Sequence, residues 1–326
     1  TRPLGAAMST HGPDSIAGAV RTGLTAPRKW LPPFLFYDEQ GSALFEKITE
    51  LPEYYVTRTE RSILERDAER IATRVLEGTP GPIAVLELGA GNAIKTDILL
   101  RAFAKVRNDL RYFPADVSPT PLEAARERLA SSLPALCVSP IVGTHADAMR
   151  SASAWEGSFV VLYLGSSIGN YEDADASVLL TDIRGVMGRH GALLLGVDRT
   201  KPLDVLLAAY DDRAGVTAAF NLNVLARINR ELQADFVLDA FRHVALWNES
   251  ASAIEMHLES VAPQSVHIAA LDLTVRFDRG ERIHTESSHK YTDGRVRDLF
   301  DSAGLLPVCA YEDAQRWFAV HVARAG

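Results

Sequence analysis

The sequence contains very little cysteine: 2 cysteines occur among 326 residues, Cys137 and Cys309, and they form no CxxC pair. Two isolated cysteines predict neither a disulfide framework nor a cysteine-based zinc site. The 9 histidines show no HExxH or similar spacing, so the sequence predicts no metal site. The lack of a disulfide pattern favours a cytosolic protein.

The chain also lacks an excess of basic charge and any long apolar run. Its 34 Lys and Arg residues are outnumbered by 42 Asp and Glu residues, for a formal net charge of −8. A general nucleic-acid binder is therefore disfavoured, because no basic excess is present to neutralise phosphates. No apolar run approaches the roughly 20 residues of a membrane span, so no membrane partner is expected. The absence of a coiled-coil pattern favours a monomer.

What the chain does contain is a strand, a glycine turn and a helix in residues 83–96. Residues 83–88 are nearly all apolar, which predicts a parallel strand buried on both faces. Gly89 and Gly91 follow, and at such positions the backbone can turn tightly and let a ligand approach. A helical pattern then begins at Ile94. Open α/β sheets bind nucleotide-like ligands at this place, which makes the stretch a candidate cofactor site.

One missing glycine narrows the choice of ligand. A dinucleotide fingerprint would have a third glycine at position 94, where this chain has isoleucine, so a nicotinamide oxidoreductase is disfavoured. The acid Glu87 followed by Gly-x-Gly fits the first motif of S-adenosylmethionine (SAM) methyltransferases better. An ordinary strand-to-helix loop remains an alternative interpretation of the turn by itself.

Further strand and helix repeats bring more polar residues to the same edge of the predicted sheet. A second strand ends at Asp116, whose carboxylate can accept two hydrogen bonds from a ribose diol or can cap the next helix. Asp147 follows a third strand, in a position where SAM enzymes often hold the adenine amino group. A fourth strand leads into a second glycine turn at Gly165 and then to Asn170. An asparagine amide there can both accept from and donate to a substrate.

The pattern changes after Thr200. Residues 200–232 are helical in pattern, and from Phe241 onward strands follow one another without intervening helices. Residues 254–259 alternate apolar and polar side chains, which indicates a half-buried antiparallel strand. A run of strands after a run of strand and helix repeats predicts a second subdomain.

Six motifs of the chain are shared with one enzyme family. They read Tyr-Asp-Glu-Gln-Gly-Ser-Ala-Leu-Phe-Glu at 37–46, Leu-Pro-Glu-Tyr-Tyr at 51–55, Leu-Gly-Ser-Ser-Ile-Gly-Asn at 164–170, Ala-Tyr-Asp-Asp at 209–212, Gly-Val-Thr-Ala-Ala-Phe-Asn at 215–221 and Thr-Glu-Ser-Ser at 285–288. On these motifs the sequence resembles the L-histidine Nα-methyltransferases of ergothioneine biosynthesis, which convert histidine to its trimethylated betaine, hercynine. The resemblance covers most of the chain, from about Phe34 to the C-terminus.

The resemblance implies an α/β fold in which a Rossmann-like SAM methyltransferase sheet carries an inserted α+β substrate-binding domain. Transferred to this chain, the SAM-dependent domain comprises residues 58–199 plus 291–326, and the histidine-binding domain comprises residues 9–57 plus 200–290. This partition agrees with the change of pattern near Thr200.

The resemblance also implies which residues bind histidine. Glu286 and Ser288 would hold the two imidazole nitrogens, with Met256 and Phe45 as apolar walls. The residues expected at the carboxylate and amine of the substrate are Tyr37, Tyr54, Asn170 and Tyr210, of which Asn170 and Tyr210 would orient the amine. Without the resemblance, Glu286 would be interpreted as a solvated charge in an alternating strand.

For the cofactor, the resemblance implies a set of residues around the two glycine turns: Gly89, Gly91, Lys95, Asp116, Asp147 and Gly165. Lys95 would reach the carboxylate of SAM, although a solvated lysine on a helix is the alternative. The expected chemistry is in-line transfer to the amine, three times over, with histidine and its methylated forms as the small-molecule partners. No dedicated base stands out in the sequence.

Two other functions remain open. An enzyme that forms the betaine of another aromatic amino acid, such as tyrosine, would have the same fold, but a phenol pocket has no need of the Glu286 carboxylate beside Met256. A SAM-binding protein without catalytic activity is disfavoured because every expected substrate position is retained.

Overall fold

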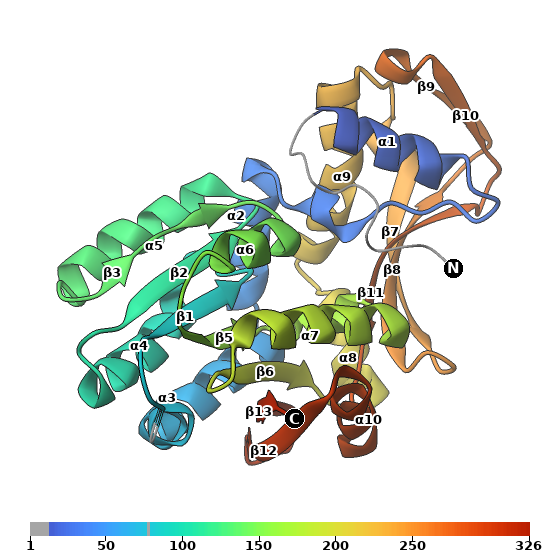
Figure 1. Cartoon of the computed structure of the whole chain (residues 1–326). Helices are drawn as coiled ribbons and strands as arrows, with labels where there is room; N and C mark the ends of the chain where they lie inside the picture. The colour runs from blue at the N-terminus through green and yellow to red at the C-terminus, as the bar shows by residue number, and fades with distance from the viewer. Residues whose placement is uncertain (1–12, 77–78) are drawn as a thin grey trace. The chain divides into compact units, whose positions relative to one another are not determined.

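The computed structural model describes residues 13–76 and 79–326 (Figure 1). The contacts within the chain divide it into two compact units, each formed from two separate stretches of sequence. Unit 1 comprises residues 1–55 and 201–289, and unit 2 comprises residues 56–200 and 290–326. Residues 9–12 of the expected substrate domain lie outside the described residues.

Unit 2 is built on one large, mostly parallel sheet. Its strands are β1 (Ile83–Leu88), β2 (Arg111–Asp116), β3 (Cys137–Val138), β4 (Ile141–Val142), β5 (Ser158–Tyr163), β6 (Ala192–Asp198), β12 (Leu305–Glu312) and β13 (Phe318–Ala325). The order is β12-β13-β6-β5-β1-β2-β3, and β4 also pairs with β2. All pairs are parallel except β13 with β6 and β12 with β13, which form an antiparallel edge. The predicted Rossmann-like α/β fold is confirmed.

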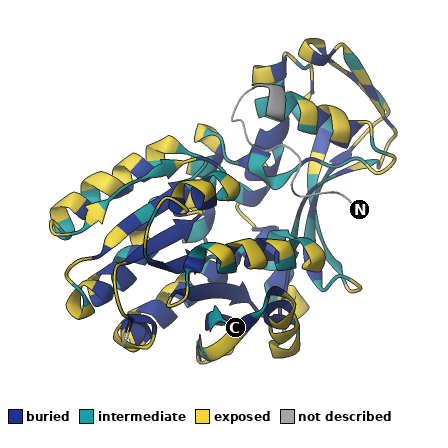
Figure 2. Ribbon diagram, in the orientation of Figure 1, coloured by how far each residue is buried: buried dark blue, intermediate teal, exposed yellow. Residues whose placement is uncertain are grey.

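Helices cover both faces of this sheet. They are α3 (Tyr55–Leu76), α4 (Ile94–Val106), α5 (Pro119–Ser132), α6 (His145–Ala152), α7 (Asp173–Met187), α10 (Asp293–Ala303) and the short 3-10 helix η2 (Ser167–Asn170). Because side chains alternate along a strand, Leu86 and Leu88 of β1 join α6, α7 and α10 in one core, while Glu87 contacts Thr96 of α4 on the opposite face. Strands β1, β5 and β6 are buried along their whole length (Figure 2).

The third predicted strand differs from the expectation. Residues 136–142 form two short strands, β3 and β4, rather than one. Pro140 lies between them and has no backbone N–H to donate, so a continuous ladder through this position is not possible. Both pieces still pair with β2, since Ser139 N donates to Tyr112 O at 2.8 Å and Gly143 N donates to Asp116 O at 2.9 Å.

Unit 1 combines helices with two small antiparallel sheets. Its helices are α1 (Pro13–Leu24), η1 (Pro33–Phe36), α2 (Glu39–Glu50), α8 (Leu203–Tyr210), α9 (Val216–Leu232), η3 (Leu238–Ala240) and η4 (Ala269–Leu271). Its strands are β7 (Phe241–Asn248), β8 (Ala253–Ser260), β9 (Gln264–Ile268), β10 (Leu273–Phe277) and β11 (Arg282–His289). The sheets have the orders β11-β8-β7 and β10-β9, and every pair is antiparallel.

The start of α2 and the break between α8 and α9 show how local chemistry sets the helix ends of unit 1. Asp38 caps helix α2, because its carboxylate accepts from Gly41 N at 2.7 Å. Asp212 accepts from the backbone N–H groups of Val216 and Thr217 at 3.0 and 2.7 Å, and thereby caps the start of α9. The helical pattern over 200–232 is therefore two helices.

Candidate cofactor and substrate sites

The turn after β1 has the conformation that its glycines suggest. Gly89 and Gly91 have φ angles of 73° and 52°, in the left-handed region that favours glycine. The N–H groups of Gly89 and Ala90 both donate to Ala115 O at 2.9 Å, which ties the turn to the end of β2. A Cβ atom built on Gly91 would have no heavy atom within 4 Å, so the space beside the turn is open.

Asp116 at the end of β2 contacts this turn directly. Its Oδ2 accepts from Gly91 N and its Oδ1 accepts from Ser118 N, each at 2.9 Å. Burial raises the pKa of Asp116, against the effect of these backbone donors. Each carboxylate oxygen keeps a lone pair beyond the one that the backbone uses. The structure thus brings Asp116 together with Gly91, and the side chain retains acceptor capacity for a hydroxyl group.

Lys95 and Gly165 are linked through Glu60, an acid outside the predicted cofactor residues. Lys95 Nζ forms an ion pair with Oε2 of Glu60, and Oε1 of Glu60 accepts from Gly165 N at 2.8 Å. Glu60 is fully buried on α3. A signal for it exists in the sequence, because Glu60 precedes Ile63 and Leu64 by three and four residues and so lies on the apolar face of the helix.

Glu87 lies beneath the glycine turn and joins three elements. Thr96 Oγ1 of α4 donates to its Oε1 at 2.5 Å, and the hydroxyl of Tyr112 on β2 donates to its Oε2. Burial raises the pKa of Glu87 to about 7. This acid of the Glu-Leu-Gly-x-Gly motif therefore holds β1, β2 and α4 in place around the turn.

Asp147 has a structural partner for each of its oxygens. It lies in the first turn of α6, where Oδ2 accepts from the backbone N and the Oγ1 of Thr144 at 3.0 and 2.7 Å in a capping box. Its Oδ1 accepts from Arg150 Nη1 at 3.0 Å. The hydrogen bonds from Thr144 hold the pKa of Asp147 below its usual value. The expected contact with adenine stays a prediction.

His145 lies next to the glycine turn and was not singled out from the sequence. A Cβ atom on Gly89 would be 4.0 Å from its Nε2, and its ring packs edge-on against Tyr163 with 5.3 Å between centroids. Burial lowers the pKa of His145 to about 4, so the imidazole is neutral near pH 7. In the sequence, a lone histidine after a short strand does not indicate that its side chain lies beside the glycine turn.

Asn170 ends the turn that follows β5. Gly165 and Ser166 both have positive φ angles, 72° and 59°, and the Oγ of Ser166 accepts from Asp198 N at 2.9 Å. The short helix η2 then runs from Ser167 to Asn170. Asn170 therefore belongs to unit 2, whereas the other residues expected around histidine belong to unit 1.

In unit 1 the four aromatic residues expected at the substrate lie in one series of ring contacts. Tyr37 packs edge-on against Phe45, Phe45 against Tyr54, and Tyr54 against Tyr210, with centroid distances of 5.9, 6.3 and 6.4 Å. Phe220 of α9 lies 6.1 Å from Tyr37 and 6.0 Å from Phe45 and was missed as a site residue. Its signal was present, since Phe220 belongs to the shared motif at 215–221.

The remaining three residues expected at the substrate share one face of the β8–β11 pair. Met256 lies directly opposite Glu286, and Ser288 follows two residues later on the same side of β11. All three side chains are buried. The hydroxyl groups of Ser288 and Tyr210 are 2.6 Å apart, which joins this face to the end of α8. An acceptor and a hydroxyl about 7 Å apart along one strand could bind the two edges of a small polar ring.

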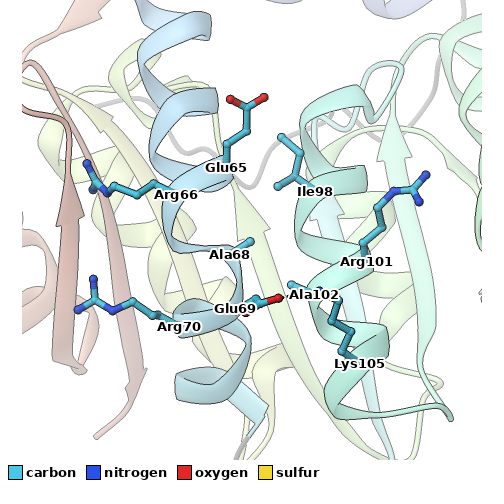
Figure 3. Close-up of a pocket in the computed structure, with 9 residues that line it drawn as sticks. All are labelled: Glu65, Arg66, Ala68, Glu69, Arg70, Ile98, Arg101, Ala102 and Lys105. Atoms are coloured by element: carbon cyan, nitrogen blue, oxygen red, sulfur yellow. Dashed lines mark hydrogen bonds and ion pairs between the residues drawn. The ribbon is translucent and has the colours of Figure 1, made fainter.

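A groove between α3 and α4 of unit 2 is a separate feature (Figure 3). Its lining is Glu65, Arg66, Ala68, Glu69, Arg70, Ile98, Arg101, Ala102 and Lys105, none of which is an expected site residue. Lys105 pairs with Glu69 at 2.6 Å across it, and both side chains are well exposed. This charged surface groove has no feature of a small-molecule site, which is typically concave and largely apolar.

Residues 13–76 and 79–326 contain no group of three His, Cys, Asp or Glu side chains arranged to hold a metal ion. Over the same residues, no helix has both the length and the apolar character needed to cross a membrane.

Comparison with known proteins adds the family context. Residues 16–325 match the model of a family described as "Histidine-specific methyltransferase, SAM-dependent". The chain is 42% identical over 315 residues to histidine N-alpha-methyltransferase from Mycolicibacterium smegmatis, covering 95% of this chain and 96% of that protein. It is 40% identical over 304 residues to the protein of the same name from Mycobacterium tuberculosis, covering 93% of each. Ergothioneine biosynthesis protein 1 from Schizosaccharomyces pombe is 28% identical over 98% of this chain and 41% of that protein.

Proposed function

The chain belongs to the histidine-specific, SAM-dependent methyltransferase family, and from this premise we propose that it trimethylates the α-amino group of L-histidine to hercynine. This reaction is the first step of ergothioneine biosynthesis. The observation that carries the proposal within this chain is the buried face of β8 and β11, where Glu286 lies opposite Met256 and Ser288 contacts Tyr210.

Glu286 and Ser288 can recognise a neutral imidazole from both sides. The Glu286 carboxylate accepts from the ring N–H, while the Ser288 hydroxyl donates to the unprotonated ring nitrogen. The contact of 2.6 Å between Tyr210 and Ser288 supports this arrangement. When the Tyr210 hydroxyl donates a hydrogen bond to Ser288 Oγ, Ser288 can turn its own hydrogen toward the imidazole. Met256 and Phe45 supply apolar walls.

This pairing would also exclude other aromatic side chains. A phenol or an indole lacks the combination of one ring N–H donor and one ring nitrogen acceptor. Neither ring can satisfy the buried Glu286 carboxylate and the Ser288 hydroxyl at the same time, and such a mismatch discriminates between substrates by orders of magnitude. The same pocket therefore selects histidine over tyrosine and tryptophan.

For the amino-acid end of the substrate we infer roles for Tyr37, Tyr54, Tyr210 and Asn170. The ring contacts that connect Tyr37, Tyr54 and Tyr210 through Phe45 support a common role for the three tyrosines. Tyrosine hydroxyl groups can donate to a carboxylate and accept from an amine. The role of Asn170, together with Tyr210, in orienting the amine rests on the family motif.

The chemistry of unit 2 fits the cofactor of the family. SAM, when bound, supplies an electrophilic methyl group on a positively charged sulfur atom. The residues that would hold it are Gly89, Gly91, Lys95, Asp116, Asp147 and Gly165. Two observations support the set: the space beside Gly91 is open, and Asp116 keeps free acceptor positions next to the turn for a ribose diol.

Positioning is the main contribution that the chain's residues make to the reaction. The amine must be neutral to present a lone pair, and acceptors such as the Tyr210 hydroxyl and the Asn170 carbonyl oxygen can fix its direction by taking its N–H bonds. Holding reacting groups in near-attack geometry is worth about 7–11 kcal/mol of the barrier. The mono- and dimethylated amines must lose a proton before the next transfer. The trimethylated product has no proton to lose, so the series ends there.

We further propose that the protein acts as a monomer in the cytosol, with histidine and methylated histidines as its small-molecule ligands. These points rest on the sequence pattern and the family. Elution of the purified protein at the mass of one chain in size-exclusion chromatography with light scattering would support the monomer, and elution at twice that mass would overturn it.

The test of the function is a screen of substrates. The purified protein is incubated with SAM and each of the twenty amino acids, and product masses are measured. A gain of three methyl groups on histidine alone supports the proposal. Three methyl groups on tyrosine or tryptophan instead would keep the cofactor site and overturn the roles of Glu286 and Ser288. No product with any amino acid would favour a SAM-binding protein without catalytic activity.

A further inference from the structure

Tyr210 is held by its backbone as well as by its hydroxyl. It is the last residue of α8, where carbonyl groups have no partner within the helix. His243 of β7 provides a partner for the carbonyl of Tyr210, because its Nε2 lies 2.8 Å from Tyr210 O. The end of α8 is therefore attached to the sheet that carries Glu286 and Ser288.

Asn221 of α9 determines which nitrogen of His243 carries the proton. Its Nδ2 lies 2.9 Å from His243 Nδ1 and 3.1 Å from His257 O, so both amide hydrogens are used. The carbonyl of His257 can only accept, and this fixes the orientation of the amide. His243 Nδ1 must then accept, and Nε2–H donates to Tyr210 O. Asn221 Oδ1 is buried and has no hydrogen-bond partner among the residues that the structure describes.

We propose that Asn221 and His243 are positioning residues that hold Tyr210 so that its hydroxyl meets Ser288 and the bound histidine. This inference rests on the proposed function of unit 1 as the histidine-binding unit. The two residues touch neither the ring nor the hydroxyl of Tyr210 through these contacts, but they fix the backbone from which its side chain projects. Asp212, which caps α9, secures the other end of the segment that joins α8 to α9.

The arrangement requires a neutral imidazole. A proton on His243 Nδ1 would face the Asn221 amide hydrogens, which cannot accept it. Burial lowers the pKa of His243, and the Tyr210 carbonyl, Asp211 and Asp212 on the segment after α8 oppose that shift. His257 of β8 lies on the opposite face of the sheet, and a charge on either histidine would disfavour a proton on the other.

The first test compares two replacements of His243. His243→Gln keeps a side-chain N–H that can reach Tyr210 O, whereas His243→Phe keeps the ring shape and removes the donor. The probe is L-histidine, titrated calorimetrically in the presence of S-adenosylhomocysteine. We expect His243→Phe to weaken histidine binding by about tenfold or more and His243→Gln to recover most of it. Binding of S-adenosylhomocysteine alone should be unchanged in both.

A matched control is His321→Phe, which also removes a half-buried imidazole but lies on β13 of unit 2. It should leave histidine binding as in the wild type. A merely structural role for His243 would lower histidine binding, cofactor binding and thermal stability together in His243→Phe, with no recovery in His243→Gln. That pattern would overturn the inference.

The second test asks whether the effect passes through Tyr210. In a Tyr210→Phe background the hydroxyl that contacts Ser288 is gone, so His243→Phe should cause little further loss of histidine binding. Equal losses in both backgrounds would overturn the inference and leave the proposed function intact. A wild-type protein that does not bind histidine would instead overturn the proposed function, and the inference with it.

A third measurement determines directly which ring nitrogen of His243 carries the proton. Long-range 1H–15N spectra of the histidine rings should show His243 with a bare Nδ1 and a protonated Nε2 near pH 7. The variant Asn221→Asp replaces the donor beside Nδ1 by an acceptor, so it should shift His243 toward the doubly protonated form. A protonated Nδ1 in the wild type would contradict the proposed hydrogen bonds of Asn221 and His243.

Discussion

Glu286 is a buried carboxylate on β11 and lies directly opposite Met256 of β8. A carboxylate at this position can accept a hydrogen bond from the imidazole N–H of histidine, as the proposed function requires. We predict that Glu286→Ala lowers kcat/KM for histidine by about 100-fold, since it removes a hydrogen bond to a charged group inside the pocket. The affinity for SAM should change by less than about twofold, because the expected cofactor residues belong to unit 2.

Steady-state kinetics with histidine and a separate SAM-binding titration measure the two effects. The matched control is Glu255→Ala, which removes a half-buried carboxylate from the opposite face of the neighbouring strand. Histidine kinetics in Glu286→Ala that equal those of the wild type would refute the assignment of the pocket.

Glu87 makes stability depend on pH through its position beneath the glycine turn. Burial raises its pKa from 4.5 to about 7, so the folded protein retains this proton more strongly than the unfolded chain. The ionised form is disfavoured in the fold, and stability is therefore lost as pH rises from about 4.5 through about 7. We predict that Glu87→Gln, which stays neutral, removes this contribution.

The measurement is the urea-unfolding free energy of both proteins at pH 5 and pH 8. Between these values the wild type should lose up to about 3 kcal/mol relative to Glu87→Gln, since one pKa unit corresponds to about 1.4 kcal/mol. Parallel pH dependence in the two proteins would show that Glu87 does not keep a raised pKa.

At the scale of residues, the sequence motifs point to side chains that the structure brings together but do not show how they are supported. Gly91 and Asp116 are in contact, as are Tyr210 and Ser288. The spacing of Glu60 places it on the apolar face of its helix, but the contacts that Glu60 and His243 make could not be predicted, because each acts on a distant part of the chain. Asp147 was predicted as a cofactor residue, and in the structure its carboxylate accepts hydrogen bonds in the capping box of α6. The sequence pattern did not predict this short helix.

At the scale of elements, β11 contains an irregularity that determines which of its residues lies opposite Met256. The register with β8 shifts between His284 and Glu286, so Thr285 is the additional residue of a β-bulge. A bulge changes which side chains face each side of a sheet, and here it places Glu286 opposite Met256. Thr285 Oγ1 donates to Met256 O at 2.9 Å in the buried interior and so holds the bulge in place.

We predict that Thr285→Val, which keeps the shape and removes the hydroxyl, destabilises the fold by about 1–2 kcal/mol because Met256 O loses its donor. Histidine binding should weaken several-fold, and SAM binding should be retained. Chemical unfolding and the two binding titrations measure these effects. Thr274→Val, at an exposed position of β10, is the control, and it should change neither property. A Thr285→Val protein with normal histidine affinity would show that the bulge does not depend on this bond.

The elements that the sequence predicted well are those with strong periodicity. The expected strand at residues 83–88 has the bounds of β1, and the alternating pattern at 254–259 lies within β8. The failures have local causes. Pro140 divides the third strand, α6 is only eight residues long, and β9 was not distinguished from the loops beside it. Short elements offer too few residues for a period to be recognised.

At the scale of the whole molecule, each unit is assembled from two stretches that are far apart in the sequence. The proposed function gives the units different ligands, with SAM at the turns of unit 2 and the imidazole of histidine at β8 and β11 of unit 1. A ligand stabilises the segments that it contacts by an amount that grows with its concentration over Kd. The division of ligands between the units is therefore open to a direct measurement.

We predict that hydrogen exchange separates the two ligands. S-adenosylhomocysteine should protect the amides of residues 83–96 and 111–118, whereas histidine added to that complex should protect residues 253–260 and 282–289. Peptides from β9 and β10 carry none of the proposed ligand contacts and should exchange at an unchanged rate. The concentrations should be about 100 times Kd, at which binding contributes about 2.7 kcal/mol and slows local opening measurably. If histidine protected residues 83–96 while leaving β8 and β11 unchanged, the imidazole would be bound at the glycine turn, and the assignment of unit 1 as the histidine-binding unit would have to be given up.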